Sequence, residues 1–193
     1  MIFMRVKDDT KKTAIMNATI SLSNEIGFSN VSMSKIAKRA GVSAATLYVY
    51  YESKEDMFCN VYKEVKIQMS HECGKNVCKD DTVEQSVRKI CENLLLYMQE
   101  HTEEFLFIEQ SANSPFATEE VLNEIELHNK ETVSIFERGI KEGILKPASP
   151  ALLIGFCYYP IQQIFKECKK PGSVLSDVDF STVFQMCWDA IKN

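Results

Sequence analysis

Residues 31–54 read VSMSKIAKRAGVSAATLYVYYESK, and this stretch decides the expected architecture. Two helices that cross at a steep angle through a short turn need small residues where they touch. Ala37, Ala40 and Gly41 provide such residues at the turn, and Leu47 fills the space between the two helices. The stretch therefore predicts a helix-turn-helix.

The second helix of this pair is expected to be short, with Ser43 as its N-cap and an end near Tyr50. Its first half holds only small side chains, namely Ser43, Ala44, Ala45 and Thr46. A helix with such an N-terminal half can enter the major groove of DNA closely. Lys54 begins the next helix, where its charge and the N-terminal amides can both meet a phosphate.

Residues 13–62 resemble the DNA-binding domain of the TetR/AcrR family. The resemblance rests on Ile36-Ala37, Ala40-Gly41-Val42-Ser43, Thr46-Leu47-Tyr48, Tyr50-Tyr51 and Ser53-Lys54-Glu55. This combination at this spacing is highly specific, and it covers about a quarter of the chain. The remainder resembles the family only in its length, its helix count and the run Glu142-Gly143-Ile144-Leu145, which leads out of a long helix.

The resemblance implies which residues contact DNA. Residues 44–46 would face base edges and nearby phosphates, Tyr48 and Lys54 would bind phosphate, and Ser34 would reach the backbone or a base. The full expected set is Ser34, Ser43, Ala44, Ala45, Thr46, Tyr48, Tyr50 and Lys54. For Tyr50, a buried position is an equal alternative. Because alanines occupy the base-facing positions, we expect contact with thymine methyl groups, or recognition of DNA shape, to matter more than hydrogen bonds to bases.

The charge of the chain is unevenly distributed. Residues 1–55 hold eight Lys and Arg against five Asp and Glu, a net +3. The remainder holds fourteen against twenty-two, a net −8, which gives the −5 of the whole chain. An acidic body with a mildly basic N-terminal part fits a protein that touches phosphates with one end only.

The fold class expected is all-α, with about nine helices. Glycine (7) and proline (5) are scarce in the 193 residues, which favours long helices over a sheet rich in turns. Hydrophobic periodicity and caps place the helices at about 8–26, 33–40, 44–50, 54–73, 83–98, 102–112, 118–143, from 150 to before the break at Pro171-Gly172, and 177–191. We expect residues 8–55 to form a three-helix DNA-binding domain and residues 56–193 to form a helical ligand-binding and dimerisation domain.

Other function classes find little support in the residues. The most apolar stretch, 152–161, is about half the length that a bilayer requires, and the N-terminus does not read as a signal peptide. The seven cysteines have no repeated spacing and are interpreted as reduced, mostly buried thiols of a cytoplasmic protein. His71, Cys73 and Cys78 are the nearest approach to a metal cluster, but their spacing matches no strong zinc pattern. We therefore expect no metal, no cofactor and no enzymatic activity.

Aromatic and sulfur-containing residues are plentiful in the C-terminal part. They form either a plain core or the lining of a cavity for an apolar or amphipathic effector, and the family resemblance favours the cavity. The candidate lining residues are Tyr62, Tyr97, Met98, Phe105, Asn129, Phe136, Phe156, Tyr159 and Gln163. The last two helices are too apolar to be covered within one subunit, so they are expected to pair with a second copy as a four-helix bundle.

The function predicted from these features is a ligand-responsive transcriptional repressor. It would bind a near-palindromic operator in double-stranded DNA as a homodimer and be released by a small apolar or amphipathic effector. Two alternatives remain open: a TetR-like activator or regulator that responds to a protein partner, and a helical metal-binding or enzymatic body with a vestigial DNA-binding part.

Overall fold

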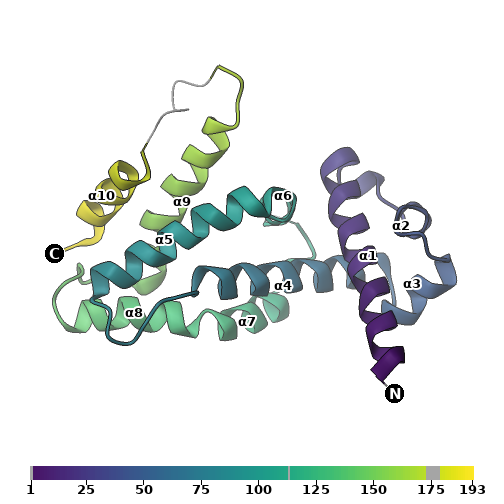
Figure 1. Ribbon diagram of the computed structural model, residues 1–193, viewed down its shortest axis with the longest axis horizontal. Helices are drawn as coiled ribbons and strands as arrows, with labels where there is room; N and C mark the ends of the chain where they lie inside the picture. Colours follow the sequence, from purple (N-terminus) through teal and green to yellow (C-terminus); the bar gives the residue numbers. More distant parts are fainter. Residues whose placement is uncertain (1, 113, 173–178) are drawn as a thin grey trace. The chain divides into compact units, whose positions relative to one another are not determined.

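The computed structural model describes residues 2–112, 114–172 and 179–193, with side chains described from residue 9 onward (Figure 1). This part of the chain holds ten α-helices and one short 3-10 helix, which confirms the all-α fold class. The chain divides into two compact units. The head unit comprises Met1–Lys66 and Thr102–Ile125, and the body unit comprises Ile67–His101 and Glu126–Asn193.

The head unit begins with a long helix that positions the helix-turn-helix. Its helices are α1 (Ile2–Ile26), η1 (Phe28–Asn30), α2 (Met33–Ala40), α3 (Ala44–Tyr50), the first part of α4 (Lys54–Cys73), α6 (Thr102–Ser111) and the first part of α7 (Glu119–His128). Gly27 ends α1 with a φ of 74°, in the region that glycine adopts without a steric penalty. The expected start near residue 8 was wrong, because residues 2–7 contain no helix breaker and the helix continues through them.

The short helices of the head unit begin at serine caps, of which Ser43 was predicted. The Ser32 hydroxyl accepts a hydrogen bond from the Lys35 amide at the start of α2, and the Ser43 hydroxyl accepts one from the Thr46 amide at the start of α3. Gly41 ends α2 in the left-handed conformation, with a φ of 67°. These three local signals fix the turn between α2 and α3.

The body unit is built around the long apolar helix α9 (Pro150–Cys168). This helix contacts α5 (Val83–Glu100), α8 (Lys130–Lys141) and α10 (Phe180–Ile191). Its core contains Val87, Cys91, Leu94, Met98, Phe136, Leu153, Cys157, Ile161, Phe184 and Trp188, all of them buried. Thr82 and Gln85 form a capping box at the start of α5, and the Ser149 hydroxyl with Pro150 opens α9.

Residues 118–143 differ from expectation, because they form two helices instead of one. Helix α7 ends at His128 and α8 begins at Lys130, with Asn129 between them. The Asn129 side chain accepts a hydrogen bond of 2.7 Å from the Ser70 hydroxyl of α4, so a tertiary contact marks the interruption. This division raises the helix count of the described chain from the expected nine to ten.

The last helix begins slightly later than expected. Helix α10 starts at Phe180, and the Asp179 side chain accepts a hydrogen bond from the Thr182 amide as its N-cap. Residues 177 and 178, which the sequence assigned to this helix, lie outside the described residues. Among the helices that are described, none combines the length and the apolar character needed to cross a membrane.

Candidate nucleic-acid interface

Helix α3 presents one of its faces to solvent. Leu47 is fully buried and anchors the opposite face, so α3 has a fixed orientation within the head unit. Ala44 and Ala45 are exposed at its N-terminal half. Tyr48 follows one turn later, with 59% of its surface exposed. The outward face of α3 therefore consists of two methyl groups followed by a phenol.

Val49 extends this outward face, and the sequence-based prediction missed it. Its side chain is 81% exposed, although valine is an apolar residue that is usually found inside. The signal that could have found it is its spacing, because position 49 lies four residues after Ala45 and so falls on the same helical face. An exposed apolar side chain beside two alanines increases the apolar character of the face.

Hydroxyl groups gather at the N-terminal ends of α2 and α3. The Ser43 and Thr46 hydroxyls lie 2.8 Å apart, and Ser43 also caps α3. Ser34 is exposed, and its hydroxyl lies 3.1 Å from that of Ser32. These hydroxyl groups are thus held in place by local hydrogen bonds at the helix ends, where backbone amides also point outward.

Lys54 is partly buried and has a structural contact. Its ammonium donates a 2.9 Å hydrogen bond to the carbonyl oxygen of Phe28, and it lies 5.7 Å from the centre of the Phe58 ring. An ammonium group has three donors, so this bond leaves protons for a phosphate. The sequence predicted the phosphate contact and not the structural one, because Phe28 is distant in sequence.

Of the neighbouring tyrosines, Tyr51 belongs to the core and Tyr50 is half-buried. Burial, followed by the negative charges of Glu64 and Asp56, raises the pKa of Tyr51 to about 12. The Tyr51 phenol is therefore neutral at any physiological pH. The half-buried Tyr50 lies between the two alternatives that the sequence left open, which are a contact with DNA and a position in the core.

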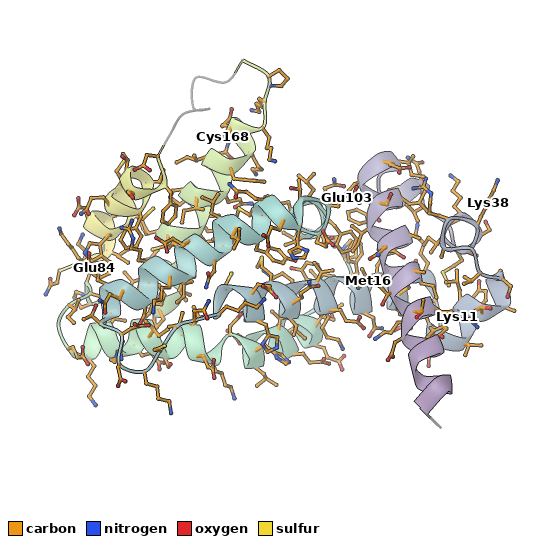
Figure 2. All side chains as sticks on the ribbon, viewed as in Figure 1. Lys11, Met16, Lys38, Glu84, Glu103 and Cys168 are labelled. Atoms are coloured by element: carbon orange, nitrogen blue, oxygen red, sulfur yellow. The ribbon has the colours of Figure 1, made fainter. Side chains whose placement is uncertain are left out.

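Some positive charge of the head unit is paired within the unit. Arg39 of α2 binds Glu25 of α1 through two hydrogen bonds of 2.7 Å, and it also reaches the Ser21 hydroxyl. The bonds from Arg39, together with a 3.0 Å hydrogen bond that the Ser21 hydroxyl donates to Glu25, lower the pKa of Glu25 to about 2. Lys11 of α1 and Lys38 of α2 are exposed cations instead (Figure 2). These two lysines were not singled out from the sequence, although exposed lysines are common phosphate contacts in proteins that bind DNA.

The nine candidate effector residues fall into three groups. Five are buried core residues: Tyr62 and Phe105 in the head unit, and Tyr97, Met98 and Phe136 in the body unit. Phe156, Tyr159 and Gln163 are exposed on α9, while the Asn129 side chain is bonded to Ser70. Within the body unit, Tyr97, Met98 and Phe136 are thus buried, whereas Phe156, Tyr159 and Gln163 lie on the surface of α9. Helical spacing in the sequence identifies the apolar face of a helix. It does not show whether that face lies in the core of the protein or on its surface.

The three residues considered for metal binding differ in their surroundings. Cys73 is buried and Cys78 is exposed, whereas the His71 ring lies 5.6 Å from that of His128. In the part of the chain that the structure describes, no group of three or more His, Cys, Asp or Glu side chains is arranged to hold a metal ion. All seven cysteines are free thiols.

The fold and the interface define a class of protein, a transcription regulator with a helix-turn-helix head and a helical body. Residues 15–61 match the family described as "Bacterial regulatory proteins, tetR family", and residues 62–193 match "Tetracyclin repressor-like, C-terminal domain". The chain therefore belongs to the TetR family of transcription regulators, which is not a family of enzymes.

Individual relatives support this assignment. The chain is 25% identical to the "Uncharacterized HTH-type transcriptional regulator YhgD" of Bacillus subtilis, over 75% of this chain and 76% of that protein. It is 28% identical to the "Fatty acid metabolism regulator protein" of the same organism, over 70% and 66% of the respective lengths. A crystal structure of a TetR family regulator from Marinobacter aquaeolei superposes with a TM-score of 0.88, at 29% identity and over 98% and 99% of the two chains.

Proposed function

We propose that this TetR-family regulator is a repressor that binds a near-palindromic operator as a homodimer and leaves it when a small apolar or amphipathic effector binds. Residues 8–55 would bind DNA, while residues 56–193 would bind the effector and form the dimer. The protein would act in the cytoplasm, where bacterial DNA lies. The observation that carries the proposal is the exposed face of α3, in which Ala44 and Ala45 precede Tyr48.

The chemistry of this face favours particular DNA sequences. Alanine and valine side chains offer no hydrogen bond to a base edge, but their methyl groups can pack against the C5-methyl of thymine in the major groove. The Tyr48 and Lys54 side chains, with the exposed Lys38, would contact phosphates and set the position of the helix on the duplex. We therefore expect an operator in which thymines occupy the positions that face Ala44, Ala45 and Val49.

The proposed dimer contact lies on α9 and α10. Leu152, Phe156 and Tyr159 form an exposed stripe along α9 at helical spacing, and half of the Phe156 surface is accessible. Met186 on α10 is 70% exposed. A contiguous apolar surface of this kind is unfavourable in water, and a second copy would cover it with the same residues about a two-fold axis. Phe156 and Tyr159 thus fit a dimer contact better than an effector cavity.

The effector proposal draws on the relatives. A structure of the regulator FadR from Bacillus subtilis in complex with stearoyl-CoA has a TM-score of 0.71 and 20% identity to this chain. That similarity shows a shared fold, and the complex shows that this fold can hold an acyl compound. For this chain, the buried Tyr97, Met98 and Phe136 remain candidate lining residues, and they would have to separate to admit a ligand.

The coupling between effector and DNA would act through α4. This helix continues from the head unit into the body unit, since its residues 54–66 belong to the first and 67–73 to the second. An effector that binds one orientation of α4 more tightly than another would shift the spacing of the two heads in the dimer. Only a difference in affinity between the two states can produce such a shift.

The test is a footprint on the DNA that flanks the gene of this protein. The purified protein should protect two half-sites whose centres lie about one helical turn, or a multiple of it, apart. A single protected half-site, or equal affinity for unrelated DNA of the same length, would contradict the proposed dimeric repressor.

A further inference from the structure

The body unit contains a pocket that none of the predicted effector residues lines. It has a volume of about 280 Å³ and lies between the segment 74–79, which follows α4, and the helices α5 and α8. Ser86 and Ile90 belong to its α5 wall, and Ile135 and Arg138 to its α8 wall. Both walls therefore combine an apolar side chain with a hydrogen-bond donor.

Two polar atoms of the pocket residues lack a hydrogen-bond partner. The Ser86 hydroxyl is fully buried and unpaired, and so is the Nε of Arg138. Buried polar atoms are paired in the great majority of cases, because an unpaired one loses its hydration without compensation. Two unsatisfied donors among the residues of one pocket point to an acceptor supplied by a ligand.

Hydrogen bonds hold the Arg138 guanidinium in place, and its positive charge is available to a ligand. Its Nη atoms donate to the carbonyl oxygens of Lys79 and Asp81, at 3.3 and 2.9 Å. The Asp81 carboxylate is paired with Lys89 instead, at 2.7 Å. The guanidinium is therefore oriented by backbone carbonyls, while the nearby carboxylate is engaged by a different cation.

The charges around the pocket favour an anion. Lys79 and Arg138 contribute two positive charges to the lining, against the single negative charge of Glu131. A carboxylate provides acceptor oxygens for both a serine hydroxyl and a guanidinium N–H, and bonds to a charged group are about twice as strong as neutral ones. The apolar walls at Ile90 and Ile135 would cover a hydrocarbon part.

We propose that this pocket binds a small carboxylic acid with a short apolar chain or ring, its carboxylate held by Ser86 and Arg138. The volume is near the lower limit for ligand pockets, so a long acyl chain with a nucleotide group does not fit inside it. The inference names a chemical class for the effector and rests on the proposed function for its effect on DNA, whereas binding itself does not require that function.

The experiment measures binding of hexanoate and benzoate to the full-length protein by titration calorimetry, with hexanamide and benzamide as neutral counterparts. At least one acid should bind with a Kd below about 1 mM, and its amide at least roughly tenfold more weakly, because the amide carries no charge for Arg138. Failure of both acids to bind, or equal binding of acid and amide, would overturn the proposal.

Two matched serine variants locate the site. Ser86→Ala should weaken binding of the acid by roughly tenfold, the effect of losing one hydrogen bond to a charged group. Ser134→Ala removes a hydroxyl from the same pocket, but that hydroxyl is already bonded to the Glu131 carbonyl at 2.7 Å, so binding should not change. Equal effects of the two substitutions would refute the role of Ser86.

A separate measurement of DNA affinity tests the proposed function independently of the pocket assignment. DNA affinity is determined in the absence of acid and again with the acid at saturation. If the acid binds and Ser86→Ala weakens its binding, the pocket assignment holds whatever the DNA result. If the protein binds no flanking DNA in the absence of acid, the repressor proposal fails while the pocket assignment stands.

Discussion

The ammonium of Lys54 donates a hydrogen bond to the carbonyl oxygen of Phe28, and this bond joins the first residue of α4 to the short 3-10 helix η1 that follows α1. The residue that the sequence assigns to a phosphate thus also links α4 to the segment between α1 and α2. The predicted phosphate contact and the geometry of the head therefore involve the same side chain.

Lys54→Ala should consequently affect stability as well as DNA binding. The loss of a partly buried, charged hydrogen bond should reduce the free energy of unfolding by about 1–2 kcal/mol, and the salt dependence of DNA binding should decrease by about one unit of slope. Denaturant titration and binding at several salt concentrations measure the two effects. Lys38→Ala, an exposed lysine of α2, is the control and should leave stability unchanged. Unaltered stability of the Lys54 variant would contradict the structural contact.

Tyr48→Phe should change DNA binding alone. The side chain is largely exposed, so removal of its hydroxyl leaves the core intact and the melting temperature constant. The affinity should fall by a similar factor for operator and unrelated DNA, because a phosphate contact carries no sequence information. Fluorescence anisotropy with both DNAs measures this. A loss confined to the operator would assign Tyr48 to a base instead.

Phe156→Glu should convert the proposed dimer into a monomer. It places a charge in the exposed apolar stripe of α9, where a paired copy would have to bury it. Leu127→Glu on α7 is the matched control, since Leu127 is similarly exposed but lies outside the proposed contact. Sedimentation velocity distinguishes the two species. If both variants remained dimeric, α9 would not be the interface.

Trp188 has a different role from Phe156, although both are aromatic residues of the last two helices. It is buried within its own body unit and stacks on Phe184 at a centroid distance of 6.3 Å. A charge at Trp188 should therefore unfold the body unit, and a variant there does not test dimerisation.

The head unit should lose stability in acid through Glu25. Its pKa is lowered from 4.5 to about 2 by hydrogen bonds from Arg39 and Ser21, so the native state binds the proton less readily than the unfolded chain. The stabilisation is therefore present above pH 4.5 and is lost as the pH falls from about 4.5 to about 2. Glu25→Gln should reduce the pH dependence of unfolding in this window, measured by urea titrations at a series of pH values. An identical pH dependence in both proteins would contradict this effect.

Gly139→Ala should destabilise the body unit. A Cβ at this position of α8 would lie 2.7 Å from Leu145 side-chain atoms and 2.8 Å from Val83, closer than packed atoms allow. We expect the free energy of unfolding to fall by about 1–3 kcal/mol, as for other overpacked cores. Thermal unfolding monitored by circular dichroism provides the measurement. Gly155→Ala in α9, where the nearest atom is at 3.4 Å, should have a much smaller effect.

The sequence predicted the helix-turn-helix well because its signals are local. Ser32, Gly41 and Ser43 act on amides and carbonyls within a few residues, so their roles are visible in a short stretch. The interruption at Asn129 was not predictable in this way, because it coincides with a contact to Ser70, which is remote in sequence.

The candidate effector residues were harder to predict for a related reason. Whether an aromatic residue lies in the core, as Phe136 does, or on the surface, as Phe156 does, depends on which helices surround it. The unpaired hydroxyl of Ser86 likewise has no signature in the sequence, because serine is common on helix surfaces and only the packing of α5 against α8 leaves it without a partner.

The central claim is that the exposed face of α3 enters the major groove, and Ala45→Glu tests it most directly. The measurement is the anisotropy of labelled operator DNA titrated with the wild type and with this variant, at two salt concentrations. Ala45 is exposed, so folding should be unaffected, whereas a carboxylate facing the phosphates should weaken binding by more than roughly tenfold. Binding equal to that of the wild type by a correctly folded Ala45→Glu variant would contradict the account.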